Sequence, residues 1–152
     1  MENIDPAMAQ RVWQRVTSAA PSEVAPASPD LQALIEAELE DAAAYLHLSR
    51  FFSDPYSRIL RQMHQQEQSH AACLKGIYRM STGRRCNPRL PRPLREKPSV
   101  TLRRCCQREL DCATQYEARS KDPVSGETFS RLAQQEREHS RFLLELLGKL
   151  QV

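Results

Sequence analysis

The sequence contains the pattern Glu-x-x-His twice, 69 residues apart, at Glu67/His70 and at Glu136/His139. On an α-helix, side chains three positions apart lie on one face, about 4.5 Å apart along the axis. Each copy therefore presents a carboxylate and an imidazole to a common point if it lies on a helix. Because such groups are costly to bury without a partner, this repeated pair strongly constrains how the chain can fold.

A second pair of residues precedes each copy. Glu38 is followed seven positions later by Tyr45, and Glu109, 71 residues beyond Glu38, is followed in the same way by Tyr116. The order Glu, Tyr, Glu-x-x-His is thus written twice with nearly equal spacing, which chance does not readily produce. Together the two halves supply four carboxylates and two imidazoles, a ligand set that holds two metal ions inside a four-helix bundle.

The composition favours a helical globular chain. Of 152 residues only four are Gly, 40% are hydrophobic and 27% are charged, which suits one domain large enough to bury a core. No stretch approaches 18 consecutive apolar residues, so we expect no membrane-spanning helix. The first residues are acidic and lack the features of a secretory signal, which predicts a cytoplasmic protein.

The apolar pattern divides the chain into two parts. Residues 1–29 carry a short amphipathic helix, at about residues 6 to 18, and a Pro/Ala/Ser linker; we interpret the helix as packing on the bundle or on a neighbouring subunit rather than as a targeting tag. Residues 30–152 carry four apolar stripes at helical spacing. Asp30 and Ser99 are suitable N-caps, the second helix should end near Gly83, and prolines follow Asp54 and Asp122 at the two breaks.

Four prolines between residues 86 and 98 predict an extended connection between the second and third helices. About 15 residues at 3.3 Å each reach roughly 50 Å, the length of a bundle. The predicted fold is therefore an all-α four-helix bundle, made of two antiparallel helical hairpins joined by a long crossover. Counted from the hairpin turns, the four repeated glutamates fall at nearly the same depth, so we expect them in one layer of the core.

Four unpaired carboxylates would repel one another in an apolar core, and bound cations remove that cost. Oxygen-rich ligation with one imidazole per ion suits iron or manganese, and zinc can occupy the same site. We expect two iron ions, which together suit the reduction of peroxide or dioxygen. The predicted metal ligands are Glu38, Glu67, His70, Glu109, Glu136 and His139. Tyr45 and Tyr116 are either core aromatics or donors of hydrogen bonds to the ligand carboxylates.

With these residues, the chain over about residues 30–150 resembles the ferritin-like superfamily, and within it the rubrerythrin-type di-iron domain. The family order of Glu, Glu-x-x-His, Glu and Glu-x-x-His on successive helices is matched here, and the Glu38 to Tyr45 spacing is similar to that of rubrerythrins. The chain has no rubredoxin-like domain, and Cys112 stands three residues beyond Glu109, where we find no counterpart of a further rubrerythrin carboxylate.

The resemblance implies roles for the ligands. Glu67 and Glu136 would bridge the two metals, Glu38 and Glu109 would be terminal carboxylates, and the two histidines terminal imidazoles. It also implies a homodimer. The expected function is an oxidoreductase that reduces hydrogen peroxide or dioxygen while Fe(II) is oxidised, with a separate electron donor, in oxidative-stress defence or iron handling. Two alternatives remain open: a non-enzymatic iron storage or loading protein, and a metal-free helical interaction module.

Residues 79–108 hold ten Lys or Arg and a single acid, Glu96, for a local charge of +9. The segment lacks interleaved aromatics and any nucleic-acid-binding motif, so we interpret it as an exposed linker and do not expect nucleic acid as a partner.

Further polar residues lie outside the repeated pattern. The five cysteines include no Cys-x-x-Cys and are expected to be reduced thiols, although Cys105 and Cys112 flank Glu109 and leave a sulfur-ligand or redox role open. His47 and His64 are expected to be structural or solvated, with His64 one turn from Glu67. Off the apolar stripes, a solvated helix face is predicted for Glu36, Glu40, Asp41 and Glu138.

Overall fold

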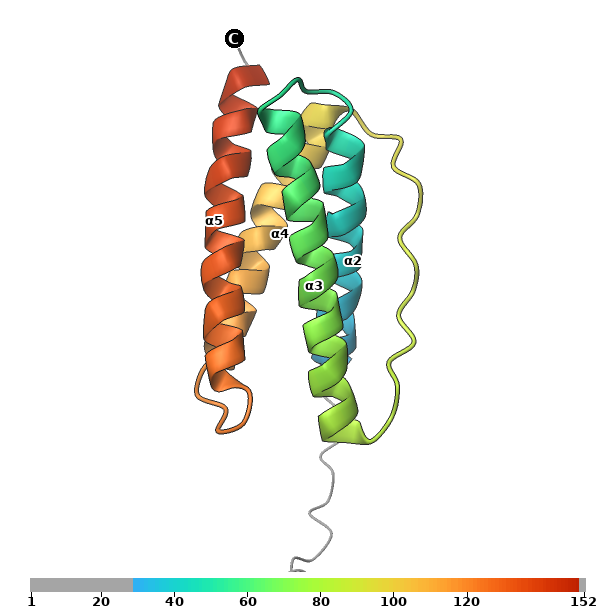
Figure 1. Cartoon of the computed structure of the whole chain (residues 1–152), viewed down its shortest axis with the longest axis vertical. Helices are drawn as coiled ribbons and strands as arrows, with labels where there is room; N and C mark the ends of the chain where they lie inside the picture. Colours follow the sequence, from blue (N-terminus) through green and yellow to red (C-terminus); the bar gives the residue numbers. More distant parts are fainter. Residues whose placement is uncertain (1–28, 151–152) are drawn as a thin grey trace, which may run out of the picture.

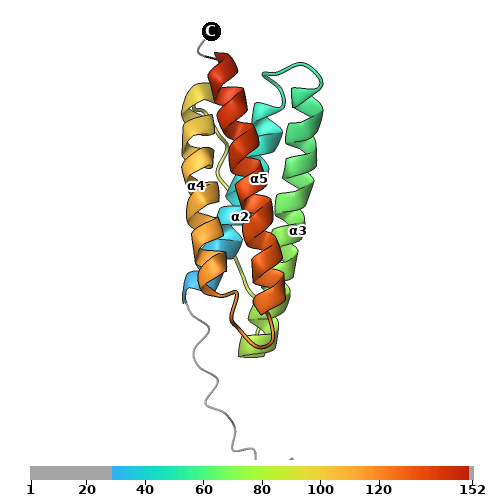
Figure 2. The same ribbon diagram turned by 90° about the vertical axis from the view of Figure 1, so that its left-hand side faces the viewer.

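The computed structural model describes residues 29–150, so the predicted N-terminal helix lies outside the described residues. Within this range the chain forms long helices and no strands, packed lengthwise into one bundle (Figures 1 and 2). The predicted all-α four-helix bundle is confirmed. The helices are α2 (Pro29–Leu48), α3 (Tyr56–Thr82), α4 (Pro98–Ala118) and α5 (Gly126–Leu150).

The bundle consists of two helical hairpins. Helix α2 packs closely against α3, and α4 against α5, whereas contacts between the hairpins are fewer. The turn of the second hairpin is built around Asp122, whose Oδ1 accepts the backbone N–H groups of Val124 at 2.9 Å and Ser125 at 2.7 Å. Gly126 begins α5 close to the residues that follow α4. A Cβ on Gly126 would lie only 2.4 Å from the Ser120 carbonyl oxygen.

Residues 83–97 form the predicted long crossover, which runs along the outside of α2 to the opposite end of the bundle (Figure 1). Gly83 ends α3 with a left-handed φ of 69°, and its N–H donates to the Arg79 carbonyl at 2.8 Å. Glycine adopts this conformation without steric cost, which explains the stop at this residue. Helix α4 begins at Pro98 with Lys97 as its N-cap, two residues before the predicted cap Ser99.

Two arginines form ion pairs along the outer face of α2. Arg89 of the crossover donates from its backbone N, Nε and Nη2 to the Glu36 carboxylate at 3.1, 3.0 and 2.9 Å. These backbone and side-chain hydrogen bonds lower the pKa of Glu36 to about 2. Arg108 of α4 reaches Asp41 with Nε at 3.0 Å and Nη2 at 2.9 Å.

The prediction of a solvated face is therefore wrong for Glu36 and Asp41, which are only 8% and 3% exposed. The α2 sequence shows a polar stripe there, but not the arginines that the crossover and α4 bring over it. Glu40 and Glu138 are exposed, as predicted.

The apolar core is divided into two clusters of buried side chains, one toward each end of the bundle. On every helix, the glutamates and histidines of the repeated pattern lie between residues of one cluster and residues of the other. A polar layer is thereby enclosed by apolar packing above and below. Among residues 29–150, no helix is long and apolar enough to cross a membrane. The first cluster contains Tyr45, Leu48, Leu60, Met63, Leu102 and Leu143; the second contains Leu34, Ile35, Leu74, Tyr116, Phe129 and Leu132.

Candidate metal centre

The six predicted metal ligands come together in the enclosed polar layer. Helices α2 and α4 each contribute one carboxylate, and α3 and α5 each contribute a Glu-x-x-His pair. None of the six residues is more than 5% exposed, so the layer is shielded from solvent. The residues are Glu38, Glu67, His70, Glu109, Glu136 and His139.

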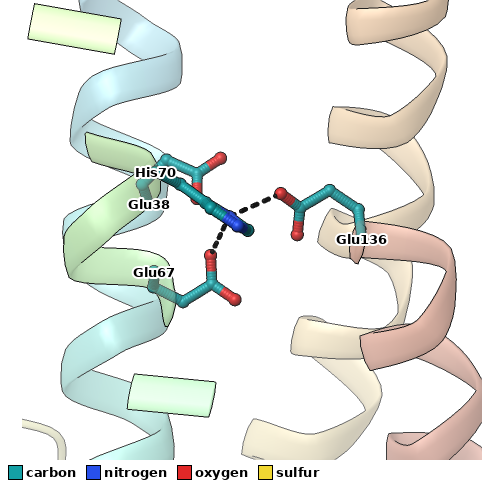
Figure 3. Close-up of side chains that lie close together, drawn as sticks. All are labelled: Glu38, Glu67, His70 and Glu136. Carbon is teal, nitrogen blue, oxygen red and sulfur yellow. Dashed lines mark hydrogen bonds and ion pairs between the residues drawn. The ribbon is translucent and has the colours of Figure 1, made fainter. Parts of the chain in front are cut away.

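These residues form two overlapping groups, each able to hold a metal ion. The first comprises Glu38, Glu67, His70 and Glu136, and Figure 3 shows it with the α3 and α2 side chains facing Glu136 across the core. The second comprises Glu109 and His139 with the same Glu67 and Glu136. In each group one ligand atom from every residue lies within 4.8 Å of the others. The two groups therefore share two carboxylates and differ in one carboxylate and one imidazole.

Both imidazoles direct Nδ1 at the carboxylates. His70 Nδ1 lies 2.9 Å from Glu136 Oε1, 3.2 Å from Glu67 Oε2 and 3.3 Å from Glu38 Oε2 (Figure 3). His139 Nδ1 lies 2.6 Å from Glu67 Oε1, 3.4 Å from Glu136 Oε2 and 3.7 Å from Glu109 Oε2. Nδ1 is thus the atom that each histidine offers to a shared cation.

Burial and the charges of neighbouring groups strongly shift the pKa values of the glutamates and histidines in this layer. Burial, together with the charge of Glu136, raises the pKa of Glu38 and of Glu109 well above the ordinary carboxyl value. Burial alone would lower the pKa of His139, but the carboxylates that surround its ring raise it to about 12, and the pKa of His70 is raised in the same way. The four carboxyl groups therefore resist being ionised together unless cations compensate them.

Three polar atoms in this layer lack a hydrogen bond within the described part of the chain. Glu67 Oε1, Glu136 Oε1 and His139 Nδ1 are buried and unsatisfied, although Glu67 Oε1 and His139 Nδ1 lie only 2.6 Å apart. Although the two atoms are close, their contact does not have the geometry of a hydrogen bond. Buried polar atoms without partners are costly, and here all three belong to the shared carboxylates or to an imidazole that faces them. The donor set therefore fits a cation.

The two repeated tyrosines contact carboxylates of the layer. The Tyr45 hydroxyl of α2 donates to Glu109 Oε1 of α4, and the Tyr116 hydroxyl of α4 donates to Glu38 Oε1 of α2. Both tyrosines are fully buried, and burial raises the pKa of Tyr116 so that its hydroxyl keeps its proton. Both tyrosines therefore donate hydrogen bonds to carboxylates of the layer and are more than core aromatics. Each contacts a carboxylate of the other hairpin.

Two glutamines at the site were not predicted. His70 Nε2 lies 3.0 Å from Gln135 Oε1, and His139 Nε2 lies 2.9 Å from Gln66 Oε1. The sequence carries a signal for them, because both copies read Gln-Gln-Glu-x-x-His. Spacing alone does not reveal their role, since each glutamine contacts the histidine of the other copy.

The remaining candidates lie outside the two groups. His64 Nδ1 lies 2.8 Å from the Ala42 carbonyl oxygen, and His47 packs against Phe51. Burial raises the pKa of Cys105 and of Cys112, which keeps both thiols protonated and opposes a role as thiolate ligands.

Comparisons of the chain with family models, with curated proteins and with solved structures found no match. The functional interpretation therefore rests on the residues and their geometry.

Proposed function

We propose that the chain is a rubrerythrin-like di-iron oxidoreductase that reduces hydrogen peroxide or dioxygen while Fe(II) is oxidised. The observation that carries this proposal is that Glu67 and Glu136 belong to both ligand groups. Two cations held by two shared carboxylates would lie close together, an arrangement that suits two-electron chemistry.

In this proposal Glu67 and Glu136 would serve both ions. Glu38 with His70, and Glu109 with His139, would complete the two sites. Four ionised carboxylates balance the charge of two divalent cations, and mixed oxygen and imidazole ligation suits iron, with manganese or zinc as possible occupants. When bound, two Fe(II) ions supply the two electrons that reduce one hydrogen peroxide, with two protons, to two water molecules.

The remaining site residues orient the ligands and exclude water. Tyr45 and Tyr116 hold the terminal carboxylates Glu109 and Glu38 by hydrogen bonds between hairpins. The apolar clusters on both sides of the layer keep bulk water away from the ligand atoms. The resemblance of the ligand order to rubrerythrins further supports this function, with a separate electron donor and a homodimer as parts of the proposal.

A metal-free helical module is the second candidate, and the charge balance of the layer favours it. Raised pKa values give two imidazolium groups, and the carboxyl groups of Glu38 and Glu109 keep their protons. The adjacent histidines lower the pKa values of Glu67 and Glu136 despite burial, so these two carboxylates neutralise the two imidazolium charges. Protons alone can therefore balance the charge of the layer.

Reaction of Fe(II)-loaded protein with hydrogen peroxide under anaerobic conditions distinguishes the two candidates. The di-iron proposal predicts rapid ferric absorption at one peroxide per two irons, and repeated turnover when a reductant is supplied. Glu136→Gln should abolish the reaction, whereas Glu138→Gln, the same change at an exposed position of α5, should preserve it. A reaction no faster than that of free Fe(II) would favour the metal-free module. Particle size in solution separates an enzyme from a storage shell.

A further inference from the structure

We propose that Gln66 and Gln135 are positioning residues that set the tautomer and direction of the two histidine ligands. This inference rests on the proposed metal site and extends it beyond the ligands. Each glutamine contacts Nε2 of the histidine on the opposite helix, at 2.9 Å for Gln66 and His139 and at 3.0 Å for Gln135 and His70. Nδ1 of each imidazole is thereby left facing the carboxylates.

The chemistry of the contact fixes the proton. An amide oxygen only accepts hydrogen bonds, so Nε2 of each histidine must carry the hydrogen that it donates. A neutral imidazole protonated at Nε2 has its lone pair at Nδ1, which is the form that binds a metal through Nδ1. A carboxylate at the same position would also accept this hydrogen bond, but it would add negative charge beside four glutamates. The neutral amide orients the ring without that repulsion.

The two contacts also join the hairpins. Gln66 and His70 lie on α3, and Gln135 and His139 lie on α5, two helices that otherwise make few contacts. The two hydrogen bonds cross between these helices in opposite directions beside the ligand layer. A shift of one hairpin against the other would therefore turn both rings away from the shared carboxylates.

Only the second glutamine of each Gln-Gln pair takes part. Gln134 is exposed and donates from Nε2 to Glu138 Oε1 at 3.2 Å, and Gln65 is exposed as well. The first glutamine of each pair therefore provides a control with the same side chain, next to the residue under test.

The two positions differ in their access to water. Gln66 is exposed and, with Gln62, Met63 and Ser69, lines a surface cavity of about 490 Å³, whereas Gln135 is half-buried. Water can replace the accepting oxygen of Gln66 more easily than that of Gln135. We therefore expect loss of Gln135 to have the larger effect.

The test uses Zn(II), which is diamagnetic, with the full chain and the variants Gln135→Met, Gln135→Glu and Gln134→Met. Methionine keeps the length of the side chain and removes the strong acceptor, whereas glutamate keeps an acceptor. We expect Gln135→Met to bind Zn(II) about 10- to 100-fold more weakly. We also expect it to lose the slowly exchanging Nε2–H signal of His70 in nitrogen-15 spectra. Gln135→Glu should restore that signal, and Gln134→Met should match the wild type.

The outcomes separate this inference from the proposed function. If the wild type binds Zn(II) and Gln135→Met keeps both the His70 signal and an affinity within twofold of Gln134→Met, the positioning role is overturned. If the wild type itself binds neither Zn(II) nor Fe(II), the proposed function is overturned first. Should Gln135→Met not fold, Gln66→Met at the exposed position gives the same comparison for His139, with Gln65→Met as its control.

Discussion

The four buried glutamates fall into two kinds according to their surroundings. Glu67 and Glu136 face both histidines, whose proximity lowers the pKa values of these two carboxyl groups despite burial. Glu38 and Glu109 have raised pKa values and each accepts a hydrogen bond from a tyrosine. The residues shared by both groups are thus the two carboxylates whose ionised form the metal-free layer favours.

The tyrosine contacts predict a cost that can be measured without metal. In Tyr116→Phe the Oε1 atom of Glu38 loses its buried donor, and we expect the free energy of unfolding to fall by about 1–3 kcal/mol. Urea denaturation of the metal-free protein checks this. Tyr78→Phe is the control, because this half-buried tyrosine is not part of the layer. Equal stability of the two variants would show that the contact with Glu38 contributes nothing.

The pKa shifts predict that metal affinity increases with pH. His139 has a pKa raised from 6.5 to about 12, so the stability that its charged form gives the metal-free protein is complete below pH 6.5 and is lost as the pH rises through about 12. A metal at Nδ1 must displace this proton. We expect the affinity for Zn(II) to rise at least about tenfold per pH unit between pH 6 and 8, in competition with a chelator of known affinity. An affinity independent of pH would contradict the assigned protonation.

At the scale of residues, the sequence predicts which side chains converge in the layer, but not which of them form hydrogen bonds with one another. The spacing of Glu38, Tyr45 and the Glu-x-x-His pairs is enough to place them on one face of each helix. It does not show that α2 lies beside α4, so it cannot say which carboxylate each tyrosine contacts. Gln66 and Gln135 were missed for the same physical reason, since both contacts cross between hairpins.

At the scale of the elements, apolar periodicity and proline positions predicted the helices, whereas their ends depended on local geometry. Helix α2 ends at Leu48, well before the predicted break at Asp54, and α4 begins before its predicted cap Ser99. The burial of Glu36 and Asp41 was not predictable from α2 alone, because arginines from two other segments cover them.

The second hairpin turn gives a test of element geometry. A Cβ at Gly126 would lie 2.4 Å from the Ser120 carbonyl oxygen, and backbone cannot easily move away. We expect Gly126→Ala to reduce the free energy of unfolding by about 1–3 kcal/mol. Gly148→Ala on the same helix has nothing within 4 Å and should be neutral or stabilising by up to about 1 kcal/mol. Thermal unfolding of both variants checks the contrast, and a harmless Gly126→Ala would refute the close approach.

At the scale of the whole molecule, the two hairpins are related by the repeat in the sequence and meet across the ligand layer. Contacts between them are few compared with those inside each hairpin. Shared ligands would therefore hold the halves together. A cation whose free concentration is 100 times its dissociation constant would stabilise the fold by about 2.7 kcal/mol. The bundle and its crossover were predictable from the sequence, because helix lengths and linker reach allow few other arrangements.

If the layer holds two metal ions that share Glu67 and Glu136, the stoichiometry of iron binding must show it. Metal-free protein would be titrated anaerobically with Fe(II), and bound iron per chain would be measured after removal of free metal. We expect two irons per chain for the wild type and for Glu138→Gln, and loss of both from Glu136→Gln, because a shared carboxylate serves both ions. One iron per chain, or binding unaffected by Glu136→Gln, would contradict it.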